Sequence, residues 1–257
     1  MTLTIDTDSR TLVIDDGGLV RTLDLYGPEA MAVLSRQWLR VAWSQRYSYT
    51  FSWLGRPLIQ LPEDVLRLQE VIYHLRPDVI VETGVAHGGS LVFHASLCQL
   101  IGQGRVIGID IEIRPHNRAA IEAHPLRSLI TLIEGSSTAP RIVDQVKALI
   151  HPGERVLVLL DSNHSYDHVS EELRRYADLV TPGSYLVVQD GIMHDLGDVP
   201  GGRREWLHDN PARAATDFAA GRADFTVEPP PWAFNESALQ EGLTHWPAGW
   251  LKKRRAD

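Results

Sequence analysis

The chain has 257 residues, of which 44% are hydrophobic and 23% are charged, and its formal net charge is −8. This composition indicates a globular protein with one sizeable core, and the negative charge argues against a nucleic-acid surface, which needs clustered Lys and Arg. The single cysteine, Cys98, excludes an intrachain disulfide and a cysteine-based zinc site. No apolar run approaches roughly 18 residues, and Met1–Asp6 lacks the pattern of a signal peptide. We therefore expect a cytoplasmic protein with no membrane or nucleic-acid partner.

Residues 1–60 differ in pattern from the rest of the chain. Thr11–Ile14 is typical of a short strand, and Gly27-Pro28 opens an amphipathic stretch that reaches about Tyr47. The aromatic-rich segment Tyr47–Trp53 follows. We expect residues 1–60 to form a cap or an oligomer contact in a homo-oligomer, and residues 61–257 to form the main domain.

From Pro62 the chain alternates between helical and strand patterns. The helical patterns cover residues 62–75, 89–101, 115–123, 139–150 and 166–179. Between them lie short, continuous apolar runs at residues 79–81, 106–109, 129–133, 156–160 and 185–188. Apolar strands joined by helices indicate a parallel sheet that is covered on both faces. The predicted fold class is α/β, with a doubly wound, Rossmann-like parallel sheet.

After Asp190 the pattern becomes irregular. We expect a loop at residues 197–202, a helix at residues 211–220 and a strand at residues 225–227. A doubly wound fold binds its ligands at the carboxyl ends of the strands, so the residues that end each strand are the candidates for function.

The first strand ends in a glycine turn that contains Glu82, Gly84, Gly88 and Ser90. Glycines there allow the backbone to approach a ligand, and the start of the next helix offers free N–H groups. The spacing differs from the G-x-G-x-x-G of dinucleotide-binding proteins. By itself, the turn is equally consistent with a tight connection between strand and helix.

The next two strands also end in polar residues. Asp110 follows the glycine turn by about the distance at which an acidic side chain accepts hydrogen bonds from a ribose. A helix N-cap is the alternative for Asp110. The third strand ends in Glu134-Gly-Ser136-Ser137, where an adenine edge could be contacted, although Ser137 could instead cap the following helix.

The fourth and fifth strands end in Asp161 and in Gln189-Asp190. Two carboxylates and an amide oxygen are hard ligands that suit Mg²⁺. His164 lies three residues after Asp161, so carboxylate and imidazole form a compact pair for metal binding and proton transfer. The alternative is that Asp161 and Asp190 cap helices or loops.

At these motifs the chain resembles the cephalosporin hydroxylase family, which looks like a set of S-adenosylmethionine-dependent class I methyltransferases that includes rhamnosyl and other deoxysugar O-methyltransferases. The resemblance is dense from about Tyr47 to Asp190, and it is carried by Trp53-Leu-Gly55-Arg-Pro57-Leu-Ile-Gln60-Leu-Pro62, Asp78-Val-Ile-Val-Glu82-Thr-Gly84-Val-Ala-His87-Gly88-Gly89-Ser90 and Leu160-Asp161-Ser162-Asn163-His164.

The resemblance implies roles for individual residues. The cofactor would be held by Glu82, Gly84, Gly88, Ser90 and Asp110, with Ser136 near the adenine. Asp161 and Asp190 would hold a divalent metal such as Mg²⁺, together with Gln189, which stands where a related member has Glu. His164 would act as the general base and Asp161 would assist it.

The predicted function is metal-assisted methyl transfer to a hydroxyl of a sugar or glycoside, such as a rhamnose, in natural-product or polysaccharide biosynthesis. Three alternatives stay open: an Fe(II)-dependent hydroxylase, a nicotinamide oxidoreductase and a non-catalytic methyltransferase-like subunit. An iron hydroxylase needs two histidines and one carboxylate, and none of the eleven histidines has the usual His-x-Asp/Glu spacing. The missing G-x-G-x-x-G weakens the oxidoreductase.

Overall fold

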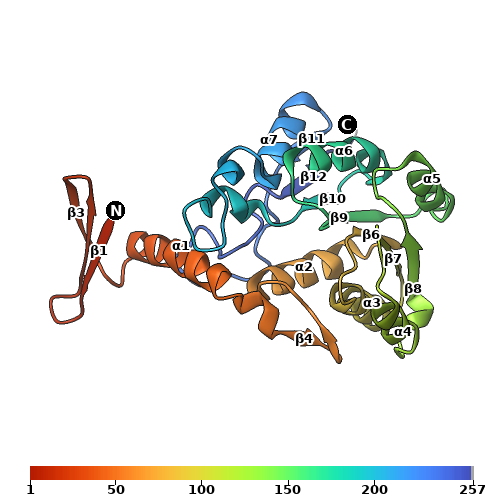
Figure 1. The fold of residues 1–257 in the computed structure, drawn as a ribbon, viewed down its shortest axis with the longest axis horizontal. Coiled ribbons are helices and arrows are strands. Elements are labelled where there is room, and N and C mark those ends of the chain that lie inside the picture. The colour runs from red at the N-terminus through yellow and green to blue at the C-terminus, as the bar shows by residue number, and fades with distance from the viewer. Residues whose placement is uncertain (256–257) are drawn as a thin grey trace.

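The computed structural model describes residues 1–255, and its main feature is a sheet with the strand order β11-β12-β10-β9-β6-β7-β8 (Figure 1). Strands β6 to β10 pair in parallel, whereas β12 pairs antiparallel with both β10 and β11. The strands are β6 Val79–Thr83, β7 Arg105–Asp110, β8 Ile130–Glu134, β9 Val156–Leu160, β10 Tyr185–Val188, β11 Phe225–Val227 and β12 Trp250–Lys253. The prediction of a doubly wound α/β fold is confirmed.

Helices cover both faces of this sheet because its strands are apolar on both sides. Along β6, Val79 and Val81 pack in one cluster and Ile80 packs in the other, as the alternation of side chains along a strand requires. The first cluster includes residues of α5 Pro140–Ala148, α6 Tyr166–Tyr176 and α7 Pro211–Gly221. The second includes residues of α2 Pro62–Leu75, α3 Gly89–Ile101 and α4 Pro115–Glu122.

The register of the central strands brings their carboxyl ends together. Thr83 is paired with Leu160, and Leu160 is paired with Val188. β6 and β9 are buried at every position, so polar residues occur only where these strands end. The segments that follow β6, β9 and β10 therefore lie side by side at one edge of the sheet.

Several strands were not predicted. β12 was missed because it has only four residues and no alternation: two buried residues are followed by two half-buried ones. The other missed strands are β1 Thr2–Asp6 and β3 Leu19–Asp24, which form a separate antiparallel sheet with the expected strand β2 Thr11–Asp16, and the two-residue strands β4 Ser52–Trp53 and β5 Arg56–Pro57. The strand pattern of β1 and β3 is weak because nearly all of their side chains are exposed.

The N-terminal sheet lies apart from the main sheet, beyond the free end of α1 Pro28–Ser44 (Figure 1). Leu12 and Ile14 of β2 form a small core with Ala30 of α1. We retain the division at residue 60 as a proposal. Within residues 1–255, no helix is long and apolar enough to span a membrane.

A short connection joins α1 to α2. It contains the 3-10 helix η1 Tyr47–Thr50 and a two-stranded hairpin of β4 Ser52–Trp53 and β5 Arg56–Pro57. Arg56 donates hydrogen bonds to the carbonyl oxygen of His87, 2.9 Å from its Nε, and to Asn117 Oδ1 at 3.1 Å. These bonds hold the connection against the turn that follows β6.

Candidate active site

Asp161, His164 and Asp190 come together at the carboxyl edge of the sheet. Each can offer one ligand atom such that all three atoms lie within 4.8 Å of one another. His164 Nε2 is 3.3 Å from Asp190 Oδ2, and both side chains are partly exposed. The structure thus groups three of the residues that were expected to hold metal or move a proton.

The backbone fixes this group from two sides. The amide N–H of Asp161 donates to the carbonyl of Thr83 at 2.9 Å, and that of Gln189 donates to Leu160 at 3.0 Å. Asp190 has a φ of +55°, a left-handed conformation that is unfavourable for a residue other than glycine and is often found at functional sites. The residues that follow Asp190 are held by the N–H of Ile192, which donates to His245 O at 2.9 Å.

His245 is in turn attached to α2. Its backbone N–H donates to Asp64 Oδ2 at 2.8 Å, and Thr244 Oγ1 donates to the other oxygen of Asp64. Burial raises the pKa of Asp64 to about 7, although these two hydrogen bonds oppose the shift. Asp64 therefore links α2 to the segment that places Asp190.

The electrostatics of Asp161 suit a cation. Loss of hydration raises the pKa of Asp161 well above its ordinary value, and the negative charges of Asp190, Glu82 and Glu172 raise it further. A divalent cation between Asp161 and Asp190 would offset this repulsion and supply the opposite charge that a poorly hydrated carboxylate needs. The residues present therefore fit a divalent metal.

Gln189 was expected to be a ligand, and its Oε1 accepts a hydrogen bond from Gln60 Nε2 at 3.0 Å. Both amides are buried, and Gln60 also lowers the pKa of Asp161 through a hydrogen bond. Metal ligation by Gln189 stays a prediction. Gln60 is a residue to which the sequence assigned no role, although it lies in the motif between Trp53 and Pro62.

The glycine turn forms one wall of a narrow cleft. A Cβ on Gly84 would lie 2.0 Å from Asp161 O, and one on Gly89 would lie 2.0 Å from Pro57 O. Gly84 also has a φ of +93°. The glycines therefore allow the turn to pack closely against the backbone at Asp161 and Pro57, and their contact with a cofactor stays a prediction. The cleft is lined by Pro57, Leu58, Ile59, Gln60, Gly84, Val85, Ala86, His87, Gly89, Ser90 and Asp161.

Asp110 organises the same turn. Its Oδ2 accepts hydrogen bonds from the N–H of Val85 at 2.8 Å and of Ala86 at 3.2 Å, and its Oδ1 accepts one from Glu112 at 3.2 Å. Asp110 does not cap α4, whose N-cap is Arg114. The carboxylate thus lies beside the cleft, and the ribose contact stays a prediction.

The other expected cofactor residues are placed less directly. Glu82 is fully buried, with Oε2 3.3 Å from His94 Nε2. Gly88 is the left-handed N-cap of α3, where the first N–H groups have no partner within the helix. Ser136 Oγ lies 3.0 Å from Thr138 Oγ1. Ser137 does not cap α5, whose N-cap is Ala139.

Another polar cluster, absent from the sequence predictions, lies beside Asp161. His168 Nε2 lies 3.2 Å from both Ser137 Oγ and Ser162 Oγ, and 3.5 Å from Glu172 Oε1. Ser162 Oγ donates to the same Glu172 oxygen at 2.7 Å. Serine and glutamate meet the same ring nitrogen, so this is not the relay of a serine hydrolase, which uses both nitrogens. The spacing of His168 and Glu172 on one helix could have suggested their contact.

The family model described as Rhamnosyl O-methyltransferase/CmcI matches residues 45–254. A rhamnosyl O-methyltransferase of Mycobacterium leprae (strain TN) is 35% identical over 148 residues, which cover 56% of this chain and 62% of that protein. One of Mycobacterium tuberculosis (strain ATCC 25618 / H37Rv) is 32% identical over 142 residues, covering 54% and 56%. This chain thus spans about six tenths of the length of the curated relatives it matches.

Solved structures show the same fold. An apo structure of CmcI has a TM-score of 0.55 and 21% identity, with 81% of this chain and 78% of the other covered. The MycE methyltransferase from the mycinamycin biosynthetic pathway, in complex with Mg and SAH, has a TM-score of 0.50 and 18% identity, with 84% and 54% covered. At these identities the likeness is evidence for the fold alone.

Proposed function

Because the chain belongs to the Rhamnosyl O-methyltransferase/CmcI family, we propose that it is an S-adenosylmethionine-dependent O-methyltransferase that methylates a sugar hydroxyl with the help of a divalent cation. The observation that carries the proposal is the group of Asp161, His164 and Asp190, which stands next to the glycine turn. In this proposal the group supplies the metal ligands and the base, and the cleft beside it receives the cofactor.

The relatives support the cofactors and the substrate class. A second CmcI structure, with a TM-score of 0.53, is described with Mg and SAM, and the MycE structure is described with Mg and SAH. The mycobacterial relatives are named for rhamnosyl methylation. We propose a deoxysugar such as rhamnose as the acceptor, as a nucleotide-activated sugar or within a glycoside of a natural product or polysaccharide.

We assign cofactor binding and cation binding to different residues. Gly84, Gly88, Ser90 and Asp110 would bind the cofactor, with Glu82 and Ser136 nearby. Asp161, Gln189 and Asp190 would hold the cation. Bound S-adenosylmethionine supplies the electrophilic methyl group, and a cation lowers the pKa of the acceptor hydroxyl.

His164 would accept the hydroxyl proton at Nε2. An imidazole nitrogen can accept a proton, and the carboxylate of Asp190, with Oδ2 3.3 Å from Nε2, would stabilise the protonated ring. Orientation of the hydroxyl by Asp161 and Asp190 contributes separately, because it fixes the direction of attack.

A second role for His164 is ligation of the cation, since its ring nitrogen is in the same 4.8 Å group. The group has one histidine and two carboxylates, whereas an iron hydroxylase of the facial type uses two histidines and one carboxylate. We therefore do not propose the hydroxylase.

The test is a binding and transfer experiment. We expect S-adenosylmethionine to bind in calorimetry and NAD and 2-oxoglutarate not to bind. Labelled methyl should pass to at least one member of a panel of nucleotide-deoxysugars and rhamnosides, and chelation should stop this transfer. Binding of NAD in place of S-adenosylmethionine, or full transfer after exhaustive chelation, would contradict the proposal.

We also propose a homo-oligomeric, cytoplasmic enzyme. Exposed apolar side chains on and near α1, including Val41 at 60% and Tyr49 at 54% exposure, support a contact with a second copy.

A further inference from the structure

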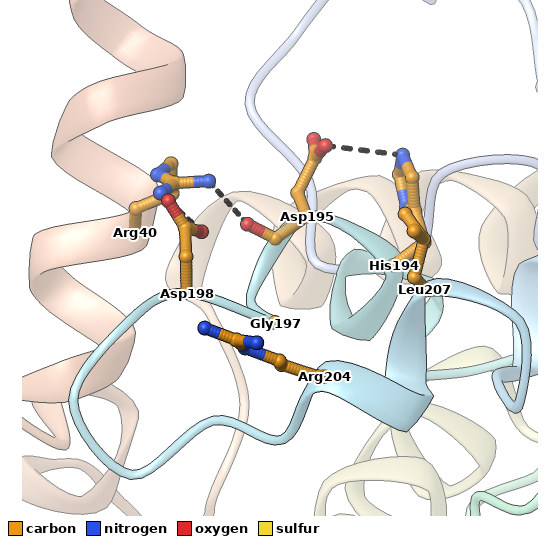
Figure 2. A pocket seen from close by; sticks show the side chains of 7 residues that line it. All are labelled: Arg40, His194, Asp195, Gly197, Asp198, Arg204 and Leu207. Atoms are coloured by element: carbon orange, nitrogen blue, oxygen red, sulfur yellow. Dashed lines mark hydrogen bonds and ion pairs between the residues drawn. The ribbon is translucent and has the colours of Figure 1, made fainter.

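A cavity of about 400 Å³ lies between α1 and the segment that follows β10 (Figure 2). None of its lining residues belongs to the cofactor cleft or to the group around Asp161. Its volume lies within the range of small-molecule sites, which is roughly 300–1,000 Å³. The lining residues are Arg40, His194, Asp195, Gly197, Asp198, Arg204 and Leu207.

The position of the cavity relates it to the acceptor side of the active site. Asp190 is followed without a gap by the 3-10 helix η4 Gly191–Asp195, whose last two residues line the cavity. A 3-10 helix rises about 2 Å per residue, so the backbone of Asp195 is roughly 10 Å from that of Asp190. This separation is one that the sugar and diphosphate of a single substrate could span.

Both aspartates of the lining have positively charged or histidine partners, whereas one arginine has no acidic partner within residues 1–255. Asp195 carries contacts from Arg36 and from His194 Nε2, the latter at 3.4 Å, and Asp198 accepts a hydrogen bond from Arg40 at 2.7 Å. Arg40 also donates to the carbonyl of Asp195. The side chain of Arg204, in contrast, makes no hydrogen bond or ion pair with any residue in the part of the chain that the structure describes.

The guanidinium of Arg204 has no acidic partner among the described residues, which favours anion binding here because the chain as a whole has a formal net charge of −8. A negatively charged protein repels anions at long range, so it can bind one only through a local concentration of positive charge. Arg40 and His194 already contact Asp195 and Asp198, so Arg204, which carries no dashed line in Figure 2, is left as the free charge of the cavity in the described structure.

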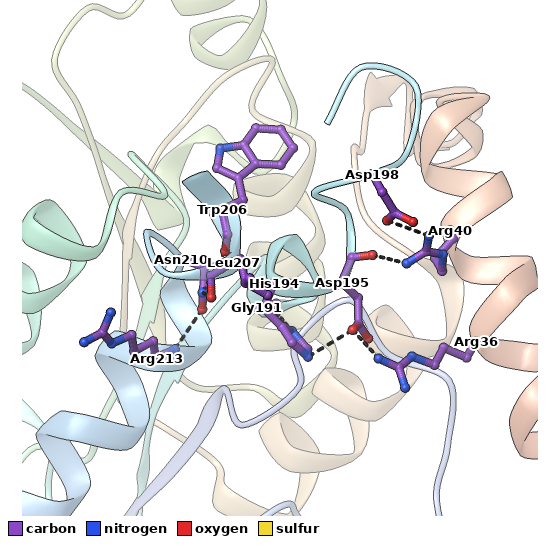
Figure 3. A network of polar contacts seen from close by, with 10 residues as sticks. All are labelled: Arg36, Arg40, Gly191, His194, Asp195, Asp198, Trp206, Leu207, Asn210 and Arg213. Carbon is purple, nitrogen blue, oxygen red and sulfur yellow. Dashed lines mark hydrogen bonds and ion pairs between the residues drawn. The ribbon is translucent and has the colours of Figure 1, made fainter. Parts of the chain in front are cut away.

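The segment that carries Arg204 is held in place. It belongs to the 3-10 helix η5 Arg204–Leu207, in which Trp206 packs edge-on against Trp43 of α1 with ring centroids 5.6 Å apart. Asn210 Nδ2 donates to Trp206 O at 2.8 Å (Figure 3). A guanidinium on a fixed backbone loses less conformational freedom when it binds an anion.

We propose that this cavity binds the diphosphate of a nucleotide-linked sugar, with Arg204 as the principal contact. The proposal rests on the proposed methyl transfer to a sugar and adds the class of acceptor. A guanidinium presents paired donors that match two phosphate oxygens. A finished glycoside without phosphate offers Arg204 only neutral oxygens, which make weaker hydrogen bonds with a guanidinium than charged ones do.

The test measures binding without turnover, on the full chain saturated with S-adenosylhomocysteine so that a nucleotide cannot enter the cofactor cleft. Thymidine diphosphate, thymidine and inorganic pyrophosphate are titrated separately. We expect thymidine diphosphate to bind, thymidine to bind far more weakly, and Arg204→Ala to weaken the diphosphate about 10- to 150-fold. The affinity of Arg204→Lys for thymidine diphosphate should lie between the affinities of wild type and Arg204→Ala, because lysine keeps the charge and loses the paired donors.

Two controls separate this proposal from the proposed function. Arg21→Ala removes one positive charge from the N-terminal sheet and should leave binding of thymidine diphosphate unchanged. S-adenosylhomocysteine should bind wild type and Arg204→Ala equally, and failure to bind wild type would count against the methyltransferase itself. Equal binding of thymidine and thymidine diphosphate would overturn the diphosphate site, as would unchanged affinity in Arg204→Ala. Efficient methylation of uncharged rhamnosides by both proteins would also overturn it, in favour of a finished glycoside.

Discussion

β6 and β9 bury all of their side chains, whereas β1 and β3 of the N-terminal sheet expose nearly all of theirs. The main sheet is therefore stabilised by apolar burial on both faces, and its edge can carry a cluster of repelling acids without losing the fold. The N-terminal region holds to the main domain through polar and aromatic contacts of α1, among them Arg40 with Asp198 and Trp43 with Trp206. The buried strands thus stabilise the fold and the residues that follow them carry the chemistry. The chain before α2 contributes the contacts of α1 and also residues of the cleft, such as Leu58 and Gln60.

The largest expected effect is at the acids of the sheet edge. Asp161→Ala and Asp190→Ala should reduce turnover to background while the fold and most of the cofactor affinity remain, because the strands beneath are buried independently of these side chains. Rates of labelled methyl transfer and thermal unfolding check this. Asp167→Ala, an exposed acid at the start of α6, is the control. If the Asp161→Ala protein were unfolded, the stability of the buried sheet would depend on the acidic side chains at its edge, contrary to this prediction.

His164→Ala should lower kcat by about 10²- to 10⁴-fold with little change in KM, because a general base acts in the transition state. If His164 is a ligand instead, the affinity for Mg²⁺ in calorimetry should fall together with the rate. His151→Ala, in an exposed loop, should change neither quantity. A kcat within a few-fold of wild type would remove His164 from the mechanism and make Asp161 the next candidate for the base.

Asp110→Ala should weaken the binding of S-adenosylmethionine by about 10- to 150-fold, because a hydrogen bond to a charged group is lost. Asp110→Asn distinguishes two roles in the same calorimetric titration. The amide oxygen can still accept from the N–H of Val85, so retention of most affinity would favour a role in the turn. Loss equal to that of Asp110→Ala would favour direct contact with the ribose. Unchanged binding in Asp110→Ala would refute both.

Asp64 is a carboxyl group buried in the apolar main domain, where it accepts hydrogen bonds from Thr244 and His245. Its pKa is about 7 in the fold and near 3.8 in the unfolded chain, so between these values the folded state binds more protons. Its contribution to stability is full below about pH 4 and is lost as the pH rises through about 7. We expect Tm to fall between pH 5 and 7.5 in wild type and to fall less in Asp64→Asn. Parallel Tm curves for the two proteins would show that Asp64 is ionised in the fold.

The smallest effect is expected from deletion of residues 1–26, which removes the N-terminal sheet and leaves α1. Because this sheet buries little more than Leu12 and Ile14 against Ala30, affinity for S-adenosylmethionine should stay within about twofold of wild type. Calorimetry gives the affinity, and size-exclusion chromatography with light scattering shows whether an oligomer is lost. A large loss of cofactor affinity would mean that the N-terminal region is part of the site.

The sequence by itself determined the fold class and where the acids of the site would meet. Continuous apolar runs predicted the parallel strands, and residues that end neighbouring parallel strands necessarily share one edge, so Asp161 and Asp190 could be paired before any coordinates were known. The glycine turn was predictable for the same reason, because left-handed backbone conformations favour glycine. These are local rules, with a period of a few residues.

Only the tertiary structure decided which distant segments support that edge. Gln60 meets Gln189 across 129 positions of the chain, and Asp64 meets His245 across 181. The hydrogen bond of Arg40 to Asp195, which helps to form the cavity beside the active site, joins residues 155 apart. None of these contacts leaves a periodic trace, because each depends on how helices and loops pack after the sheet has formed. The strand ends are fixed by local pattern, and their partners are fixed by packing.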